Sequence, residues 1–176
     1  MKLSEAKFRK ILGLFPTGVV VVTGFYGKED FGITISSFTS LSLKPPQILF
    51  CLSKDSQTMP IFERVPYFVV NILSSDQVYL SNVFARRHPL DWDKIKTHRH
   101  AETGCILLSG ALGHIICEKR ALYEGGDHKI ILGKVIDLQK SCETPPLIRH
   151  RGEYLTTQSL SSPPVEEDIS RILALF

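Results

Sequence analysis

A glycine-rich turn is followed at once by a single imidazole in the motif Gly-Gly-Asp-His at residues 125–128. Apolar runs rich in β-branched residues lie on both sides of this motif, at residues 115–117 and 130–131. The pattern predicts a β-hairpin that presents His128 where its second strand begins. A strand end is rigid enough to hold a side chain at a fixed position relative to a ligand, so His128 is a candidate catalytic residue. A plain hairpin with a surface histidine is the alternative interpretation of these four residues.

Two clusters of hydroxyl side chains are the next candidates for chemistry. Six serines and threonines fall within residues 34–42. A second set follows the next predicted strand and consists of Ser53, Ser56 and Thr58 with Lys54 among them. Hydroxyls, backbone N–H groups and a lysine beside a helix N-terminus suit a bound phosphate. Serine and threonine are also common in strands and at helix caps, which is the structural alternative for both clusters.

Short strands are the main elements expected to position these residues. Apolar and β-branched runs predict strands at residues 19–23, 33–43, 47–52, 67–73, 106–108, 112–117, 121–123 and 130–138. Helical periodicity and capping residues predict helices at residues 3–15, around 61–62, at 74–84 and at 166–176. We expect a polar turn at residues 24–32 and a long, solvated basic loop at residues 85–100.

This pattern of elements predicts a mainly β protein, an antiparallel β-barrel with a few short helices. The sequence has neither βαβ alternation nor a GxGxxG motif, so a Rossmann domain is not expected. We expect one barrel domain at residues 1–158, followed by a linker and a C-terminal amphipathic helix at residues 159–176. The runs at residues 19–22 and 115–116 are very apolar for the exposed faces of a small barrel, which predicts that a second subunit covers them.

The composition narrows the class of protein. The chain has 176 residues, of which 43% are apolar and 22% charged, as in an ordinary globular domain. A net charge of +3 suits phosphorylated small molecules and gives little support for nucleic acid. No stretch reaches about 18 consecutive apolar residues, so no membrane span is expected, and the N-terminus lacks the apolar run of a signal peptide. The four cysteines form no CxxC pair, and the histidines at residues 88–100 match no ligand spacing. These features favour reduced thiols in a cytoplasmic protein without a metal site.

Taken in order, four motifs closely resemble the flavin reductase family. They are Phe-Pro-Thr-Gly-Val at residues 15–19, the long serine-rich and threonine-rich string ending in Pro-Pro at 32–46, Gly-Gly-Asp-His at 125–128, and Pro-Leu followed by Gly-Glu-Tyr at 146–154. The members of this family are short-chain, FMN-binding split-barrel proteins that serve as reductase components of two-component flavin monooxygenases. The resemblance runs from about residue 8 to residue 154.

The resemblance implies a homodimer of Greek-key-type split barrels that binds FMN or FAD at the dimer interface. It implies an NAD(P)H:flavin oxidoreductase, which transfers a hydride from NADH or NADPH to the flavin and supplies reduced flavin to a partner monooxygenase. His128 corresponds to the histidine of the family's Gly-Asp-His motif, which is associated with the nicotinamide side of the site. The residues that correspond to flavin-binding positions are Thr34, Ile35, Ser36, Ser37, Phe38, Cys51, Leu52, Ser53, Lys54, Ser56, Thr58 and Tyr154.

The chain departs from the family at several points. Ser36 stands where many relatives carry Asn, Ile35 where a smaller residue is frequent, and residues 85–100 are unusually basic. The choice between FMN and FAD, the choice between NADH and NADPH, and whether the flavin is a substrate or a prosthetic group all stay open. So does the identity of any monooxygenase partner. A pyridoxamine phosphate oxidase-like flavoprotein and a non-catalytic FMN carrier or redox sensor are the competing interpretations.

Overall fold

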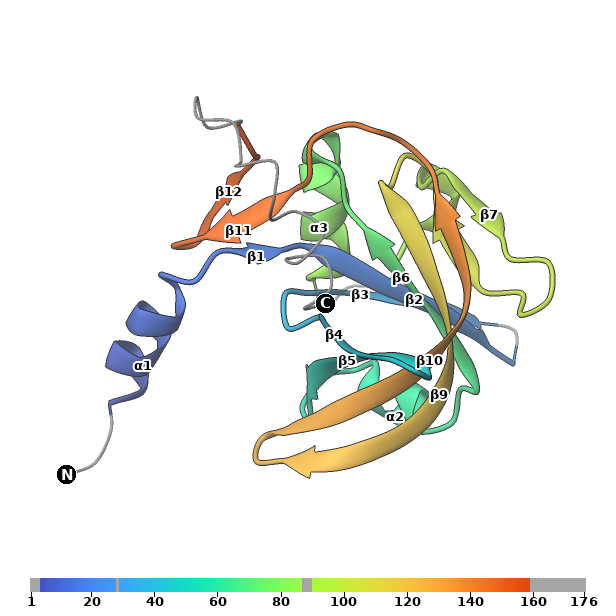
Figure 1. Ribbon diagram of the computed structural model, residues 1–176, viewed down its shortest axis with the longest axis horizontal. Helices are drawn as coiled ribbons and strands as arrows, with labels where there is room; N and C mark the ends of the chain where they lie inside the picture. Colours follow the sequence, from blue (N-terminus) through green and yellow to red (C-terminus); the bar gives the residue numbers. More distant parts are fainter. Residues whose placement is uncertain (1–3, 28, 87–89, 159–176) are drawn as a thin grey trace.

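The computed structural model describes residues 4–27, 29–86 and 90–158, and the segment expected to form a linker and helix at 159–176 lies outside them. Twelve strands and a few short helices make up the described chain, which confirms the mainly β class (Figure 1). The helical elements are α1 (Glu5–Leu12), α2 (Met59–Phe62), α3 (Val78–Phe84) and the 3-10 turns η1 (Ser75–Gln77) and η2 (Trp92–Lys94). The predicted helix at 3–15 is therefore present in shorter form as α1, the one around 61–62 is α2, and the one at 74–84 is divided into η1 and α3.

Seven antiparallel strands curl into the split barrel, in the order β3-β2-β6-β9-β10-β5-β4. Their bounds are β2 (Val20–Tyr26), β3 (Glu29–Ile35), β4 (Thr39–Leu43), β5 (Pro46–Ser53), β6 (Tyr67–Ile72), β9 (Gly113–Gly125) and β10 (His128–Lys140). Beside the barrel, a small sheet joins β1 (Thr17–Gly18), β11 (Ile148–His150) and β12 (Glu153–Leu155). A two-stranded sheet pairs β7 (Thr97–Arg99) with β8 (Ile106–Leu108).

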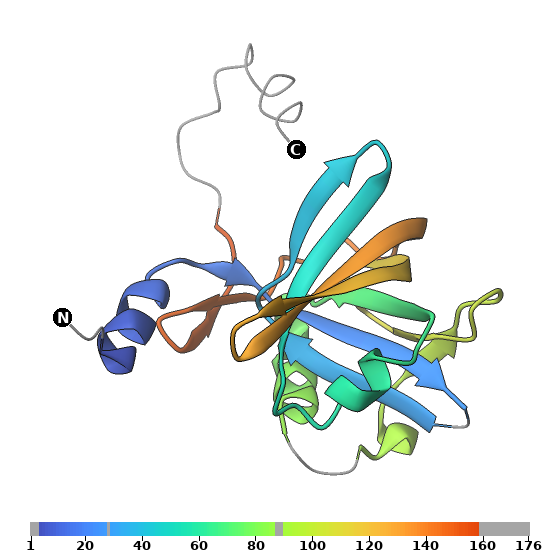
Figure 2. The same ribbon diagram turned by 90° about the horizontal axis from the view of Figure 1, so that it is seen from below.

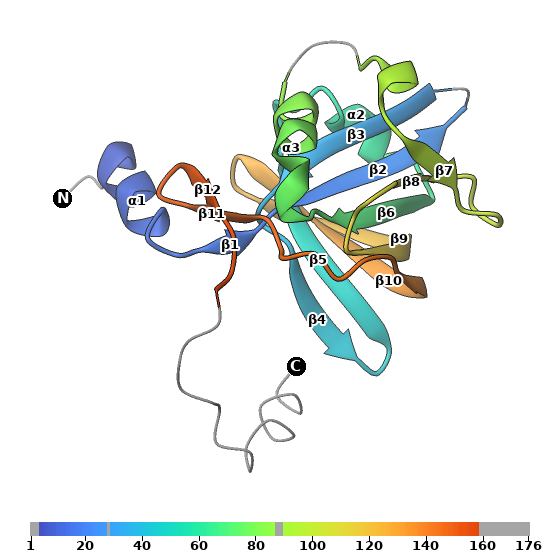
Figure 3. The ribbon, with the colours of Figure 1, turned by 90° about the horizontal axis from the view of Figure 1, so that it is seen from above.

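The valine run at residues 19–22 is buried on both faces within one chain. Val20 and Val22 point into the barrel interior, while Val19 and Val21 pack in a second cluster with side chains of α3, which lies against the outer side of β2 and β3 (Figure 3). The expectation that a second subunit covers this run, and Ile116 in β9, is therefore wrong, because α3 and β8 supply the cover. Phe62 of α2 fills the barrel with further phenylalanines in edge-to-face contact.

Several predicted boundaries are wrong because strands continue through polar or glycine-containing residues. The expected turn at 24–32 consists mostly of strand, since β2 continues to Tyr26, β3 begins at Glu29 and Phe31 packs across Gly24. The strands expected at 112–117 and 121–123 form one strand, β9, of 13 residues. The expected loop at 85–100 contains η2 and β7, and its His100 is buried, with Nδ1 against the Thr103 hydroxyl.

The single strand expected at 33–43 is two strands, β3 and β4, separated by residues 36–38. Ser37 in this break reaches β5, where its hydroxyl donates to the Cys51 carbonyl at 2.9 Å and accepts from the Cys51 N–H at 3.0 Å. One side chain thus makes both hydrogen bonds that a neighbouring strand would make to Cys51.

Candidate functional site

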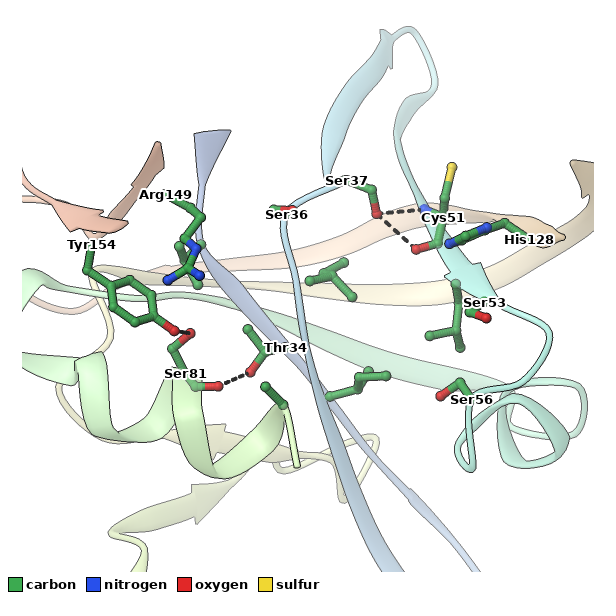
Figure 4. Close-up of a pocket in the computed structure, with 15 residues that line it drawn as sticks. Thr34, Ser36, Ser37, Cys51, Ser53, Ser56, Ser81, His128, Arg149 and Tyr154 are labelled. Carbon is green, nitrogen blue, oxygen red and sulfur yellow. Dashed lines mark hydrogen bonds between the residues drawn. The ribbon is translucent and has the colours of Figure 1, made fainter. Parts of the chain in front are cut away.

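A pocket of about 480 Å³ opens between the end of β3, β5, the start of β10, α3 and the small sheet (Figure 4). It brings together residues that lie more than 100 positions apart in the chain. Its lining includes ten of the thirteen residues expected from the sequence: Thr34, Ile35, Ser36, Ser37, Cys51, Leu52, Ser53, Ser56, His128 and Tyr154. Phe38, Lys54 and Thr58 are not in this lining.

The predicted hairpin is present, and His128 is the first residue of its second strand. In the ladder, His128 pairs with Gly125 on β9 and with Ser53 on β5, so two neighbouring strands fix its backbone. The Lys54 N–H also donates to the Asp127 carbonyl at 3.0 Å, which ties the turn to the loop after β5. His128 Nδ1 lies 2.7 Å from the Asp127 carboxylate. This hydrogen bond and the imidazole charge lower the pKa of Asp127.

The hydroxyls of the pocket are partly engaged within the protein. Thr34 Oγ1 donates to the Ser81 carbonyl at 2.8 Å, and Ser37 bonds Cys51 as described, so these two hydroxyls have already used their protons. Ser56 Oγ and Thr58 Oγ1 lie 2.8 Å apart. Ser53 Oγ accepts from the Asp55 N–H at 3.3 Å and keeps its own O–H for another acceptor. Thr34 and Ser37 can therefore only accept from a ligand, whereas Ser53 can still donate.

The three expected residues outside the lining have other surroundings. Phe38 packs against the barrel core. Lys54 turns toward the hairpin and forms an ion pair with Glu124 at 2.5 Å, which lowers the pKa of Glu124 through the hydrogen bond and the charge. Thr58 lines an adjoining pocket of about 250 Å³, which shares Ser53 and Ser56 with the first and also contains Arg86.

The loop after β5, where the sequence predicts a bound phosphate, offers fewer free donors than expected. Backbone N–H groups were expected to contribute, but those of Asp55, Ser56 and Thr58 already bond Ser53 and Ser56 within the loop. The helix that follows, α2, has four residues, too few for its dipole to add up to much at its N-terminus. Free hydroxyls therefore remain at this loop, and Arg86 lines the adjoining pocket beside them.

Sequence reasoning missed Ser81 and Arg149, which also line the main pocket. Tyr154 lies between them in the structure. Its hydroxyl donates to Asn82 Oδ1 at 3.1 Å and lies 2.8 Å from Ser81 Oγ, while the Arg149 guanidinium stacks on its ring at 4.5 Å from the centroid. The sequence signal for Arg149 was its place inside the last family-like motif. Ser81 had no signal, because only the docking of α3 brings it to β3.

The structure supplies three further facts about the kind of protein. No helix of the described residues is long and apolar enough to cross a membrane. Within residues 4–27, 29–86 and 90–158, no group of three or more His, Cys, Asp or Glu side chains is placed to hold a metal ion. All four cysteines are free, and burial raises the pKa of the Cys117 thiol to about 12.

The barrel and its pocket define a split-barrel protein with a composite pocket lined by hydroxyls, an imidazole and a guanidinium. The model of the flavin reductase like domain matches residues 12–158. The chain therefore belongs to the flavin reductase family, and the resemblance stated from its motifs is confirmed.

Individual relatives agree with this assignment. The reductase subunit HsaB of a flavin-dependent monooxygenase from Rhodococcus jostii is 35% identical over 157 residues, covering 86% of this chain and 77% of that protein. The FMN reductase (NADH) SmoA of Agrobacterium fabrum is 37% identical over 137 residues, covering 76% and 75%. The NADH:FAD oxidoreductase SgcE6 of Streptomyces globisporus, solved with NAD and FAD fragments, superimposes with a TM-score of 0.84 at 34% identity, covering 92% of this chain and 100% of that chain.

Proposed function

We propose that the protein is an NADH-dependent flavin reductase that supplies reduced FMN or FAD to a flavin-dependent monooxygenase. One observation carries the proposal beyond family membership. The turn at residues 125–128 holds His128 in the same pocket as the hydroxyl residues of β3 and β5, so one cavity offers groups for two cofactors. The names of relatives support NADH as the reductant and include both FMN and FAD as the acceptor.

The residues present fit a flavin by the chemistry of their donors and acceptors. Thr34 and Ser37 are left as acceptors, which suits the N–H and O–H groups of a flavin ring and ribityl chain. Ser53, Ser56, Thr58 and Arg86 line the adjoining pocket and suit a phosphate. The flavin supplies the capacity to take up a hydride, and the protein supplies binding and orientation.

His128 is the residue that we assign to the nicotinamide side. Its ring is anchored through Nδ1 to Asp127, which leaves Nε2 for a ligand. Holding the flavin and nicotinamide rings near van der Waals contact accounts for most of the acceleration that hydride transfer requires. A triad or a pair of catalytic carboxylates is not needed for hydride transfer, and no carboxylate is among the described residues of the main pocket lining. The proposed role of His128 is to orient the nicotinamide.

We further propose a homodimer, on grounds different from the valine run. Helix α1 lies away from the barrel beside the small sheet, and the β4–β5 hairpin projects from the barrel in a different direction (Figures 2 and 3). No residue of α1 is buried, although the helix has an apolar face. The large apolar side chains left exposed on α1, β4 and β10 include Phe8, Ile11, Leu12, Leu41, Leu43 and Leu138. Apolar surface on two projecting elements supports a second copy of this chain as its cover.

The decisive experiment measures NADH oxidation by the purified protein with and without added FMN or FAD. A reductase consumes NADH when flavin is present, and kinetics with the four pairs of FMN or FAD and NADH or NADPH give its preferences. A yellow protein that holds FMN tightly and oxidises no NADH would instead support the carrier or sensor.

We place the protein in the cytoplasm, a location that its four free thiols support.

A further inference from the structure

Arg149 is the one permanently charged side chain among the described residues that line the main pocket. It lies on β11, the middle strand of the small sheet, where it pairs with Thr17 of β1 on one side and Tyr154 of β12 on the other. Figure 4 shows it with Tyr154 and Ser81 at one side of the pocket, while Ser53, Ser56 and His128 lie at the opposite side. The two sides are thus chemically different, one cationic and the other made of hydroxyls and an imidazole.

The guanidinium is held in place without being neutralised. It stacks on the Tyr154 ring at 4.5 Å from the centroid, and the Tyr154 hydroxyl is itself fixed by Ser81 and Asn82. No ion pair or side-chain hydrogen bond joins Arg149 to any other residue within the described part of the chain. A stacked arginine of this kind presents its five N–H donors in a fixed plane.

Burial distinguishes Arg149 from the other arginines that the structure describes. Arg9, Arg64, Arg86, Arg99, Arg120 and Arg151 are exposed, whereas Arg149 is partly buried. Of the exposed ones, Arg99 binds Asp30 through both nitrogens and Arg120 binds Glu118. The Arg149 nitrogens are not among the buried polar atoms without a partner, so its donors lie open to the pocket and are available to a ligand. An anion that accepts two parallel hydrogen bonds satisfies this geometry best.

We propose that Arg149 binds a phosphate or diphosphate group of a nucleotide, at a subsite separate from the hydroxyl loop and Arg86. The inference rests on the proposed function, since the anions brought to the pocket are then those of the flavin or of the nicotinamide dinucleotide. Both sources present the same chemistry, a phosphate that accepts two hydrogen bonds from the guanidinium. Through this contact Arg149 sets how strongly the pocket prefers phosphorylated ligands over their unphosphorylated counterparts.

The test uses the full chain and equilibrium binding. Fluorescence titrations give dissociation constants for riboflavin, FMN and FAD, and calorimetry gives those for NAD⁺ and ADP-ribose. The variants are Arg149→Gln, which removes the charge, and Arg149→Lys, which keeps the charge but loses the planar pair of donors. Arg151→Gln is the matched control, because it removes an exposed charge two residues away. Melting curves accompany each variant.

We expect Arg149→Gln to weaken binding of the phosphorylated ligand by about 10- to 100-fold, the range for a charge-assisted hydrogen bond. Riboflavin binding and the Arg151→Gln control should stay unchanged. Weaker FMN or FAD binding assigns the flavin phosphate to Arg149 in place of the hydroxyl loop, and weaker NAD⁺ and ADP-ribose binding assigns the subsite to the nicotinamide dinucleotide. The dissociation constants of Arg149→Lys for the phosphorylated ligand should lie between those of the wild type and Arg149→Gln. If Arg149→Gln does not fold, the affinity of Arg149→Lys tests the proposed phosphate contact.

Two results would overturn the inference. One is an equal loss of affinity for riboflavin and the phosphorylated ligands together with a lower melting temperature, which would make Arg149 a structural partner of Tyr154. The other is a set of unchanged dissociation constants in a folded variant. A wild-type protein that binds neither flavin nor nicotinamide dinucleotide would overturn the proposed function itself, an outcome separate from either of these.

Discussion

Ser37 and Cys51 meet through one hydroxyl that serves as both donor and acceptor, at 2.9 Å to the Cys51 carbonyl and 3.0 Å from its N–H. The contact joins the segment after β3 to β5 at the place where the barrel is split. Both residues line the main pocket. The shape of one wall of the candidate site therefore depends on a side chain that replaces a missing strand.

Ser37→Ala removes both of these hydrogen bonds. Since each contributes about 0.5–1.5 kcal/mol net, we expect the free energy of unfolding to fall by about 1–3 kcal/mol and flavin binding to weaken with it. Chemical denaturation measures the first and fluorescence titration the second. Ser141→Ala is the control, because Ser141 is exposed and has no side-chain hydrogen bond among the described residues. Equal free energies of unfolding for Ser37→Ala and Ser141→Ala would show that the contact between Ser37 and Cys51 does not stabilise this wall of the pocket.

His128→Ala should impair the use of NADH while leaving flavin binding nearly normal. Loss of a neutral hydrogen bond costs about 0.5–1.5 kcal/mol and of a charge-assisted one up to about 3. Flavin reduction at limiting NADH should therefore slow by a few-fold to about a hundredfold. Stopped-flow reduction tests this beside a flavin titration and a melting curve. Asp127→Asn keeps the turn but weakens the anchor at Nδ1, and it should give a smaller effect in the same direction.

A wild-type rate of flavin reduction at low NADH in His128→Ala would remove His128 from the site. Parallel losses of flavin affinity, stability and activity would instead assign it a structural role in the hairpin.

The double variant Ser53→Ala with Ser56→Ala should weaken FMN binding more than riboflavin binding. Each hydrogen bond to a charged phosphate contributes about 1.5–3 kcal/mol, which corresponds to about tenfold or more in affinity. Riboflavin, which lacks the phosphate, serves as the internal control. Ser56 also accepts from the Thr58 N–H, so a melting curve must show that the loop still folds. Unchanged FMN affinity in a folded double variant would leave these serines as turn and cap residues.

Sedimentation equilibrium should give a particle of twice the 19.8 kDa chain at micromolar concentration. Ile11→Glu places a charge on the exposed apolar face of α1 and should shift the particle toward the monomer. Lys10→Glu changes the charge on the same helix away from this face and should leave the dimer intact. A fully active monomeric wild type would contradict the proposed assembly.

His114 should make the stability of the protein fall as the pH drops below about 6.5. The residue is buried, and its Nδ1 contacts Asn71 Oδ1 at 3.0 Å. Burial, with a smaller contribution from His98, lowers the pKa of His114 from 6.5 to about 4. Between these two values the unfolded chain binds a proton that the folded chain does not. The free energy of unfolding is therefore largest above pH 6.5 and declines toward pH 4, by at most about 1.4 kcal/mol per pH unit from this group.

The comparison of wild type with His114→Gln isolates this contribution, because glutamine can donate to Asn71 but does not titrate. Urea denaturation between pH 4 and 7.5 should show a shallower decline in the variant. Parallel pH profiles would indicate that other groups cause the decline.

The features that the sequence alone determined are local ones. Turn chemistry at residues 125–128 predicted the hairpin and the place of His128, since two glycines and an aspartate favour a tight turn whatever surrounds it. The β-branched run at 19–23 predicted a buried strand, because such a run has no polar face. The motifs around residues 34 and 53 identified eight residues that line the pocket. All of these signals lie within a few neighbouring positions.

The tertiary structure decided what depends on distant segments. Alternation suggested one strand at 33–43, but the bonds between Ser37 and Cys51 exist only once β5 lies alongside. The ion pair of Lys54 with Glu124 was not expected, and it forms because the hairpin comes within reach of the lysine. Ser81 and Arg149 enter the pocket through the docking of α3 and of the small sheet. Packing and pairing across a hundred residues leave no periodic trace in the sequence, so Ser81 could not be assigned to the pocket before the fold was known, and only the last family-like motif pointed to Arg149.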